Sequence, residues 1–187
     1  MPRVAVLASG SGSNFEAIAE AVEGTKHRVC CLICDRKEAR VFERAKRFGV
    51  PAYYVPYYRR ERPEAEAEIR SVLDQFRPDI IALAGFMRIL TPAFVDTYAG
   101  KIVNIHPALL PSFPGAHGLE ESYRSGNSEL GITIHYVDGG TDTGPIIRQA
   151  SIERQNGEPL GVVEERIHQL EHRHYPEVVL TLLDRVG

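Results

Sequence analysis

The chain has 187 residues, of which 43% are hydrophobic and 25% are charged, and its formal net charge is -3. These values are ordinary for a globular protein and argue against a nucleic-acid surface, which usually carries a strong basic excess. No apolar stretch approaches the ~20 residues of a membrane-spanning helix, and Met1 leads directly into a strand-like segment instead of a signal peptide. We therefore expect a single cytoplasmic domain over residues 1–187, without nucleic-acid or membrane partners.

The N-terminal half of the sequence alternates short apolar runs with helical patterns. The predicted strands are 4–8, 29–34, 52–55 and 80–84, and the predicted helices are 14–22, 37–48 and 61–76. Strands without polar interruptions that alternate with helices are typical of a parallel sheet with both faces covered. This half therefore predicts an α/β fold.

The C-terminal half follows a different pattern. A buried strand over 101–105 leads into a proline-rich loop. Residues 132–137 alternate in polarity and reach 145–147 through a glycine-rich turn, which predicts an antiparallel addition to the sheet. A last helix is predicted over 160–183, with a kink at Pro176. The expected fold is a single-domain, open, mostly parallel twisted sheet with helices on both faces and an antiparallel C-terminal part.

Three cysteines lie close together in the second predicted strand, and Cys31-x-x-Cys34 has the spacing of a redox or zinc pair. On a strand, residues three apart point to opposite faces and lie about 10 Å apart, beyond the ~7 Å reach of a disulfide. The sequence contains no second cysteine pair to complete a zinc site. We therefore expect three buried, free cysteines, as is usual in a reducing compartment.

A loop of small residues, Ser9-Gly10-Ser11-Gly12-Ser13-Asn14, joins the first strand to the first helix. Such a loop can turn its backbone N–H groups inward, and the helix N-terminus adds partial positive charge, so the loop is suited to hold one phosphate without Lys or Arg. A dinucleotide site is an alternative, because Asp35 ends the next strand, although Phe15 replaces the third glycine of that fingerprint. An ordinary turn capped by Ser13 or Asn14 is another.

Two polar side chains, Asn104 and His106, lie at the carboxyl end of a buried strand, where ligands bind in open α/β sheets. They are two residues apart on extended chain and therefore point to one face. An amide and an imidazole so placed suit acyl or formyl transfer, since they can stabilise an oxyanion and supply a proton. Asp138 and Asp142 in the glycine-rich turn offer carboxylates, one of which could orient or charge His106. Each of these residues could instead have a local structural role.

The remaining histidines are weaker candidates for a functional site. His117 and His135 could border the same site, since His135 lies on the alternating strand that leads toward Asp142. His168 and His172 are four residues apart on the last helix, a spacing that also suits a metal pair. No carboxylate motif accompanies them in the sequence, so a solvated or substrate-facing helix is favoured and no metal is expected.

Four motifs occur in an order and spacing that resembles the phosphoribosylglycinamide formyltransferase family, a branch of the folate-dependent formyltransferase superfamily. They are SGSGSN (9–14), AGFMRIL (84–90), NIHPALLP (104–111) and DTGP (142–145). The resemblance extends over nearly the whole chain and implies a Rossmann-like formyltransferase fold. It also implies transfer of a formyl group from 10-formyltetrahydrofolate to the amine of glycinamide ribonucleotide in purine biosynthesis, by direct attack of that amine.

The resemblance further implies roles for individual residues. Catalytic roles fall to Asn104, His106 and Asp142. Contacts to the ribonucleotide fall to Gly12, Ser13, Asn14, His168 and Glu171. Contacts to the folate cosubstrate fall to Arg62, Met87, Arg88, Leu90, Val137, Asp138, Gly139, Gly140 and Thr141. Residues 1–100 would form the phosphate-binding half and 101–187 the catalytic and folate-loop half, in a monomer or homodimer.

Other functions stay open at this point. Phe15 makes a dinucleotide-dependent oxidoreductase less favourable, and a nucleotide-sensing module would bind the ribonucleotide without formyl transfer. Within the superfamily, a methionyl-tRNA formyltransferase would normally carry a further basic C-terminal domain, and a formyltetrahydrofolate hydrolase an N-terminal regulatory domain. Residues 116–121 depart from the family's usual sequence, so the resemblance assigns them no substrate contact.

Overall fold

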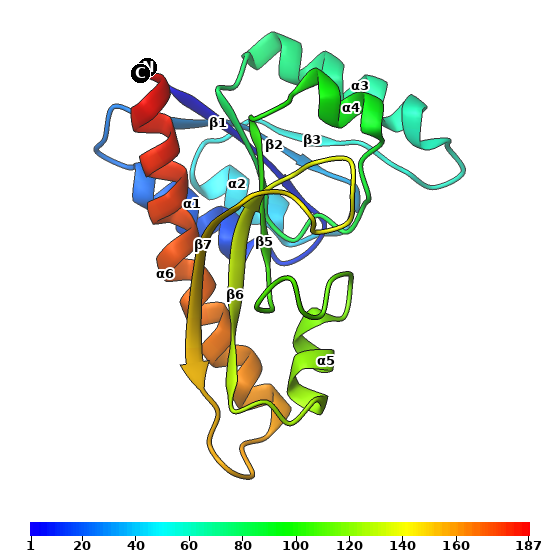
Figure 1. The fold of residues 1–187 in the computed structure, drawn as a ribbon. Helices are drawn as coiled ribbons and strands as arrows, with labels where there is room; N and C mark the ends of the chain where they lie inside the picture. The colour runs from blue at the N-terminus through cyan, green and yellow to red at the C-terminus, as the bar shows by residue number, and fades with distance from the viewer.

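All 187 residues are described by the computed structural model, which folds around one seven-stranded sheet (Figure 1). Its strands are β1 (Arg3–Ala8), β2 (Arg28–Cys34), β3 (Ala52–Tyr54), β4 (Ile80–Leu83), β5 (Ile102–His106), β6 (Glu129–Tyr136) and β7 (Ile146–Glu153). They lie in the order β3-β2-β1-β4-β5-β6-β7. The pairs among β1 to β5 are parallel, whereas β6 pairs antiparallel with β5 and with β7. The predicted mostly parallel sheet with an antiparallel C-terminal part is confirmed.

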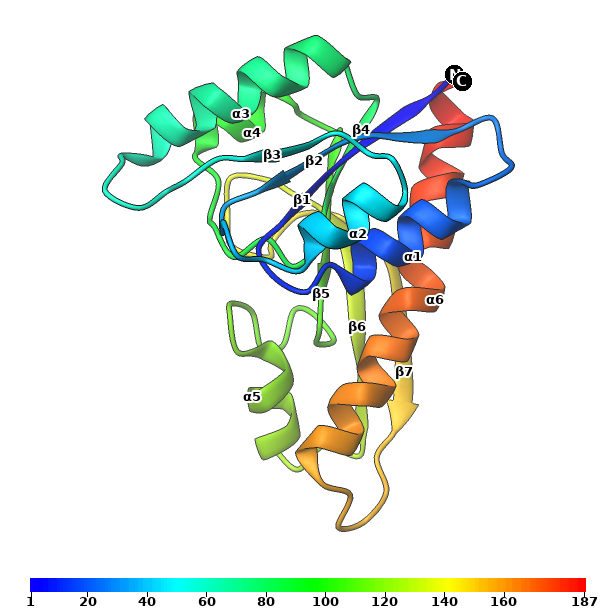
Figure 2. The same cartoon turned by 180° about the vertical axis from the view of Figure 1, so that it is seen from behind.

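Helices cover both faces of the sheet (Figure 2). They are α1 (Ser13–Val22), α2 (Val41–Arg47), α3 (Arg62–Phe76), α4 (Pro92–Thr97), α5 (Gly118–Arg124) and α6 (Leu160–Val186). α1, α2 and α6 pack on one face against Val4 and Val6, and α3 and α4 pack on the other against Ala5 and Leu7. Alternate residues of β1 thus belong to two separate cores, which explains why this strand is apolar throughout. No helix has both the length and the apolar character needed to cross a membrane.

The limits of several elements differ from the predicted ones. The sequence pattern does not predict α4 or α5, because six and seven residues are too few to show a helical repeat. α2 begins at Val41 instead of residue 37, since the residues before it form turns. β7 continues to Glu153, and α6 runs on through Pro176 as one helix.

The three cysteines are buried and free, as the strand pattern predicts. Cys31 belongs to the core beneath α3 and α4, whereas Cys34 belongs to the core beneath α1, α2 and α6. The two side chains therefore lie on opposite faces of β2, and the structural interpretation of this cluster is confirmed.

The direction of chain progress through the sheet reverses between β1 and β4, which are neighbours although they are far apart in sequence. The loops that follow these two strands are joined by hydrogen bonds. Ser9 N–H donates to the Gly85 carbonyl oxygen at 3.1 Å, and Met87 N–H donates to Ser9 Oγ at 2.9 Å. Such a reversal is where ligands bind in open α/β sheets, so the fold itself locates a crevice beside these loops.

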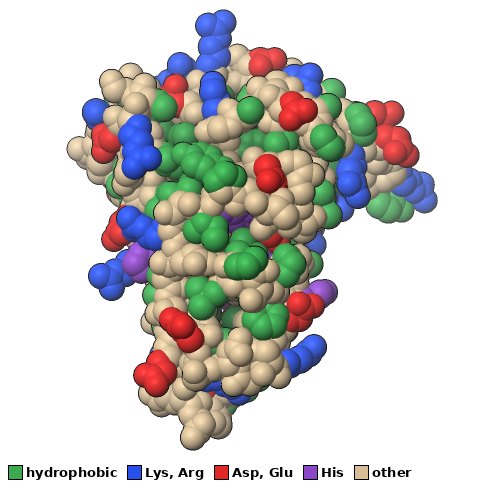
Figure 3. Space-filling view, in the orientation of Figure 1, with side chains coloured by type: hydrophobic (Ala, Val, Ile, Leu, Met, Phe, Trp, Pro, Cys, Tyr) green, Lys and Arg blue, Asp and Glu red, His purple; other side chains and the backbone are tan.

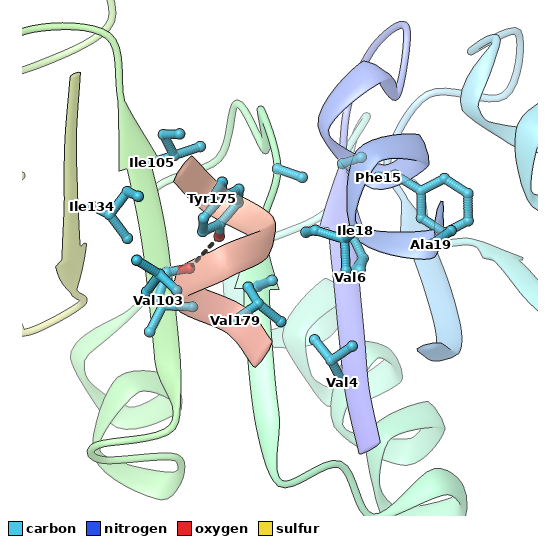
Figure 4. Packing of buried hydrophobic residues seen from close by; sticks show 14 of the residues in the cluster. Val4, Val6, Phe15, Ile18, Ala19, Val103, Ile105, Ile134, Tyr175 and Val179 are labelled. Atoms are coloured by element: carbon cyan, nitrogen blue, oxygen red, sulfur yellow. Dashed lines mark hydrogen bonds between the residues drawn. The ribbon is translucent and has the colours of Figure 1, made fainter. Parts of the chain in front are cut away.

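Tyr175 of α6 is fully buried and attaches this helix to the sheet near the same crevice. Its hydroxyl oxygen lies 3.1 Å from the carbonyl oxygen of Val103 (Figure 4) and 2.9 Å from that of Leu83. The single hydroxyl hydrogen is therefore shared between the carbonyl at the end of β4 and a carbonyl of β5 next to Asn104. This contact ties α6 to the two strands that carry the site described below.

Candidate active site

A cavity of about 320 Å³ lies at the carboxyl ends of β4 and β5. Its wall is formed by parts of four segments, 83–90, 104–107, 115–116 and 135–142. In the space-filling view, histidine is visible at the bottom of a hollow rimmed by hydrophobic side chains (Figure 3). Segments that are distant in sequence thus meet in one concave site.

His106 is held in this cavity from two sides. Its Nδ1 atom lies 3.5 Å from Asp142 Oδ2, and its Nε2 atom lies 2.8 Å from the carbonyl oxygen of Phe113. A carbonyl oxygen can only accept, so Nε2 carries a hydrogen, and a second proton on Nδ1 would face the carboxylate. The His106 side chain is only 4% exposed. Because 3.5 Å is long for a hydrogen bond, Nδ1 is the nitrogen that can serve a ligand.

Asn104 lies on the same strand and lines the same cavity, as the two-residue spacing predicts. In the β5–β6 register it stands opposite His135, and its Nδ2 atom lies 3.3 Å from His135 Nε2. His135 Nδ1 lies 2.8 Å from the carbonyl oxygen of Tyr136 and donates to it, so Nε2 of the neutral ring can accept from the Asn104 amide. His135 therefore orients Asn104, a role that the sequence pattern alone does not assign.

Asp142 connects these groups to a second loop. Its Oδ2 atom accepts a hydrogen bond from Gly115 N–H at 2.8 Å, and its Oδ1 atom lies 3.6 Å from His135 Nε2. Burial raises the pKa of Asp142, but the nearby imidazoles of His135 and His106 and the hydrogen bond from Gly115 N–H outweigh burial and hold this pKa below 3.8. Asp142 is therefore an anion at neutral pH, beside two imidazoles.

The loop between β4 and α4 supplies the apolar wall of the cavity. Met87 and Ile89 are 60% and 58% exposed there, and Leu90 is buried beneath them. Large apolar side chains left exposed at the rim of a concave site favour a ligand with an apolar surface. On the opposite wall, Asp138 is bonded within its own turn, where Thr143 Oγ1 donates to it at 2.6 Å.

Two buried acids, Asp35 just after β2 and Glu66 on α3, hold this apolar loop in place. Arg88 Nε donates to Asp35 Oδ2 at 2.5 Å, and the Arg88 guanidinium lies 5.1 Å from the centre of the Tyr57 ring. Farther along, Thr91 N–H donates to Glu66, which is only 2% exposed, at 2.7 Å. Asp35 is buried and its Oδ2 atom is bound to Arg88, which argues against the dinucleotide alternative.

The glycine-rich loop after β1 requires glycine at one position. Gly12 has φ +77°, and a Cβ atom there would lie 2.4 Å from Val41 Cγ2. No side chain caps the N-terminus of α1, so the alternative of an ordinary turn capped by Ser13 or Asn14 is wrong. The first N–H groups of a helix lack partners within it, and here they remain available to an anion.

Asn14 contacts a buried acid on α6 instead of capping its own helix. Its Nδ2 atom donates to Glu171 Oε2 at 3.0 Å, and its Oδ1 atom is buried without a partner. Burial raises the pKa of Glu171, although the Asn14 hydrogen bond and the charge of His168 oppose that rise. The loop and α6 thus present adjacent acceptors to any ligand bound at the N-terminus of α1.

We expect Glu171→Gln to stabilise the protein at pH 8 but not at pH 4. A carboxyl group with a raised folded-state pKa stabilises the fold below its unfolded pKa, and this contribution is lost as the pH rises through the folded value. Glutamine removes that loss, so the melting temperature should rise by about 2–4 °C at pH 8. Thermal unfolding of wild type and variant at both pH values measures this change in melting temperature, with the exposed Glu165→Gln on the same helix as control. An equal gain at both pH values would contradict the prediction.

The structure brings the predicted catalytic residues and most of the predicted folate contacts together in the cavity, whereas the predicted ribonucleotide contacts lie outside its wall. Arg62 is exposed at the start of α3 and does not line the cavity. Gly139 in the glycine-rich turn is also exposed and also lies outside the cavity wall. His168 is exposed on α6, and its ring centre lies 6.4 Å from that of His172. No group of three or more His, Cys, Asp or Glu side chains is placed to hold a metal ion.

An open α/β sheet whose strand ends bring an amide, two imidazoles and a carboxylate into one cavity defines a group-transfer enzyme that can stabilise an oxyanion. The chain belongs to the formyl transferase family, whose model matches residues 2–179. The fold and the family thus agree on the class of chemistry.

Individual proteins of known function resemble this chain over nearly its whole length. A phosphoribosylglycinamide formyltransferase of Bacillus subtilis (strain 168) is 44% identical over 186 residues, which cover 98% of this chain and 95% of that protein. The trifunctional purine biosynthetic protein adenosine-3 of Drosophila pseudoobscura pseudoobscura is 38% identical over 187 residues, 96% of this chain but only 14% of its own length. The crystal structure of glycinamide ribonucleotide transformylase 1 from Geobacillus kaustophilus superposes with a TM-score of 0.92 at 50% identity, covering 98% of this chain and 99% of that one.

Proposed function

We propose that this protein transfers the formyl group of 10-formyltetrahydrofolate to the amine of glycinamide ribonucleotide, giving formylglycinamide ribonucleotide in purine biosynthesis. The observation that carries the proposal is the convergence of Asn104, His106, His135 and Asp142 in one cavity at the end of β5. The names of the relatives, which cover nearly the whole chain, support the choice of substrate.

The folate cosubstrate fits the main cavity. Its flat pterin ring would lie against the apolar wall formed by Met87, Arg88 and Leu90, with Val137 and the turn 138–141 on the other side. The volume of about 320 Å³ and the mixture of apolar wall and few polar groups are typical of a small-molecule site. Arg62, which lies outside the cavity, would meet only the far, anionic end of the cosubstrate.

The ribonucleotide would bind beside the first loop. Its phosphate would accept hydrogen bonds from the backbone N–H groups of Gly12, Ser13 and Asn14, and the N-terminus of α1 would add favourable charge. Glu171, next to Asn14, would accept from the hydroxyl or amine groups of the substrate, with His168 nearer the phosphate. The loop 9–12 is hydrogen-bonded to the cavity wall through Met87, so the two substrates would lie side by side.

The chemistry follows from this arrangement. The neutral amine attacks the formyl carbon, a C–N bond forms, and the formyl oxygen gains negative charge. Asn104 Nδ2 and His106 Nδ1 donate to that oxygen, and Asp142 stabilises the protonated imidazole. The ammonium proton passes to N10 of the folate, directly or through water, as the bond between N10 and the formyl carbon breaks. An amine nucleophile needs no covalent enzyme intermediate, and placing two bound reactants together supplies much of the rate.

The proposal also covers how the domain is divided, its oligomeric state and the compartment in which it works. Residues 1–100 and 101–187 would divide the work within one domain, the first holding the phosphate and the second carrying the catalytic groups. The protein would act as a monomer or homodimer, and it would work in the cytoplasm. None of its residues is assigned to a metal.

The direct test mixes the purified protein with a 10-formyl folate and follows loss of the formyl donor with and without glycinamide ribonucleotide. The proposal expects loss that depends on the ribonucleotide. Loss that does not need it would indicate a hydrolase, and ribonucleotide binding without loss would indicate a sensing module. Either of these results would overturn the proposed function.

A further inference from the structure

We propose that Arg44 of α2 is a positioning residue for the substrate phosphate. It holds the peptide between Ser11 and Gly12 so that the N–H groups of the first loop face the phosphate, and it neutralises a carboxylate beside them. This inference rests on the proposed function, because it concerns the loop at which the ribonucleotide phosphate would bind.

Two successive peptide groups of the loop are held by α2. Arg44 Nε donates to the carbonyl oxygen of Ser11 at 2.9 Å, and Val41 N–H approaches the carbonyl oxygen of Gly10 at 3.4 Å. Both peptides are trans, and in a trans peptide the N–H points away from the C=O. The N–H groups of Ser11 and Gly12 therefore point away from α2, and neither donates to a backbone acceptor.

The Arg44 bond matters because no other group donates to the Ser11 carbonyl oxygen. Gly12 adopts a left-handed conformation, and Ser11 is exposed. Glycine and serine leave the backbone many alternative conformations. Packing of Gly12 against Val41 limits how close the loop comes to α2, but it does not determine which way the Ser11 carbonyl turns. Without Arg44, the peptide can rotate, and one N–H is lost from the phosphate cradle.

Arg44 also removes an unfavourable charge. Glu16 lies in the first turn of α1, and its side chain is 19% exposed. A carboxylate so near the helix N-terminus would repel a phosphate dianion bound there. Arg44 and Arg47 both form ion pairs with Glu16. Only Arg44 also reaches the loop carbonyl, and Arg47 is 61% exposed, so Arg47 provides a matched control.

The test compares steady-state kinetics of Arg44→Ala, Arg44→Lys and Arg47→Ala. For Arg44→Ala, KM for glycinamide ribonucleotide should rise roughly tenfold, while kcat and KM for the formyl folate stay within about twofold. Arg44→Lys keeps the charge, but its single nitrogen cannot serve both Glu16 and Ser11, so KM should still rise severalfold. Arg47→Ala should stay within about twofold of wild type.

Two more measurements separate phosphate positioning from other causes. With glycinamide riboside, which lacks the phosphate, wild type and Arg44→Ala should have equal kcat/KM. The affinity for inorganic phosphate, measured by phosphorus NMR titration, should fall roughly tenfold in Arg44→Ala. This titration does not depend on formyl transfer, so it tests the inference even if the proposed reaction fails.

The inference is overturned if Arg44→Ala leaves KM for the ribonucleotide unchanged, or if Arg47→Ala has an equal effect. It is also overturned if kcat/KM for the riboside falls in Arg44→Ala by the same factor as kcat/KM for the ribonucleotide, which would indicate general damage to the enzyme. A wild-type protein that does not bind inorganic phosphate would overturn it as well. The inference is supported if both Arg44 variants bind the ribonucleotide more weakly than wild type while their activity with the riboside is unchanged. Far-UV circular dichroism of each variant establishes that the compared proteins are folded.

Discussion

Replacing Asn104 by alanine is expected to lower kcat about 10²- to 10³-fold, the usual cost of removing one oxyanion donor. The amide is held in the cavity by His135, whose Nε2 atom lies 3.3 Å from Asn104 Nδ2. A donor fixed in this way stabilises the formyl oxygen mainly as it gains charge, so its loss should affect kcat more than either KM. Initial rates over a range of both substrates measure the separate constants.

The exposed Asn127→Ala provides the control for this change, since Asn127 lies outside the cavity. Its kcat should stay close to that of wild type. The assignment of Asn104 would be contradicted by a variant that keeps a third or more of wild-type kcat, or by a loss that lies wholly in KM for one substrate.

Replacing Asp142 by asparagine is expected to lower kcat about 10²-fold or more. Asparagine keeps the size of the side chain and can still accept from Gly115 N–H, so the change removes chiefly the negative charge beside His106 and His135. Without that charge the protonated imidazole of His106, which donates to the formyl oxygen, is less stable. The kcat of the variant relative to wild type at pH 7 measures the effect, and the exposed Asp96→Asn on α4 is the control.

The pH dependence of this variant follows from the direction of the pKa shift. Because the pKa of Asp142 lies below 3.8, the carboxylate is already ionised between pH 6 and 8.5, so its own titration adds no step to the pH profile of wild-type activity in that range. A group with a lowered folded-state pKa stabilises the protein above its unfolded pKa and loses this contribution as the pH falls through the folded value. Asp142→Asn should therefore destabilise the protein at pH 7 and not near pH 2. An Asp142→Asn enzyme with wild-type kcat at pH 7 would remove Asp142 from the mechanism.

Much of the fold follows from simple periodicity. The unbroken apolar run of β1 predicts a strand buried on both faces, and its alternate residues do enter two different cores. The spacing of Asn104 and His106 likewise predicts that they share a face, because side chains alternate along a strand. By contrast, α4 and α5 are too short for periodicity to indicate them.

The contacts within the site depend on pairings that periodicity does not contain. By residue type alone Asp138 and Asp142 are equivalent candidates, and only the family resemblance favours Asp142. The structure gives the physical reason, since Asp142 Oδ2 lies 3.5 Å from His106 Nδ1 and accepts from Gly115 N–H. The place of His135 opposite Asn104 requires the β5–β6 register. Alternation along residues 132–137 was the available signal for it, since His135 alternates with the buried Ile134.

No sequence pattern predicts the contacts that Arg44 and Glu66 make. Each lies on a helix in a run of charged residues, where a solvated surface is the ordinary expectation. Their contacts with Ser11 and Thr91 join segments 33 and 25 residues apart. Such long-range hydrogen bonds depend on how the helices pack on the sheet, so they become visible only in three dimensions.

The most direct measurement of the central claim follows a labelled formyl carbon. The protein is incubated with 10-[13C]formyltetrahydrofolate and glycinamide ribonucleotide, and the label is observed by NMR. We expect the label to move to the amide of formylglycinamide ribonucleotide in equal amount to the tetrahydrofolate released, and Asn104→Ala to slow this transfer about 10²-fold or more. Label recovered as formate, or left on the folate by a correctly folded wild-type protein, would contradict it.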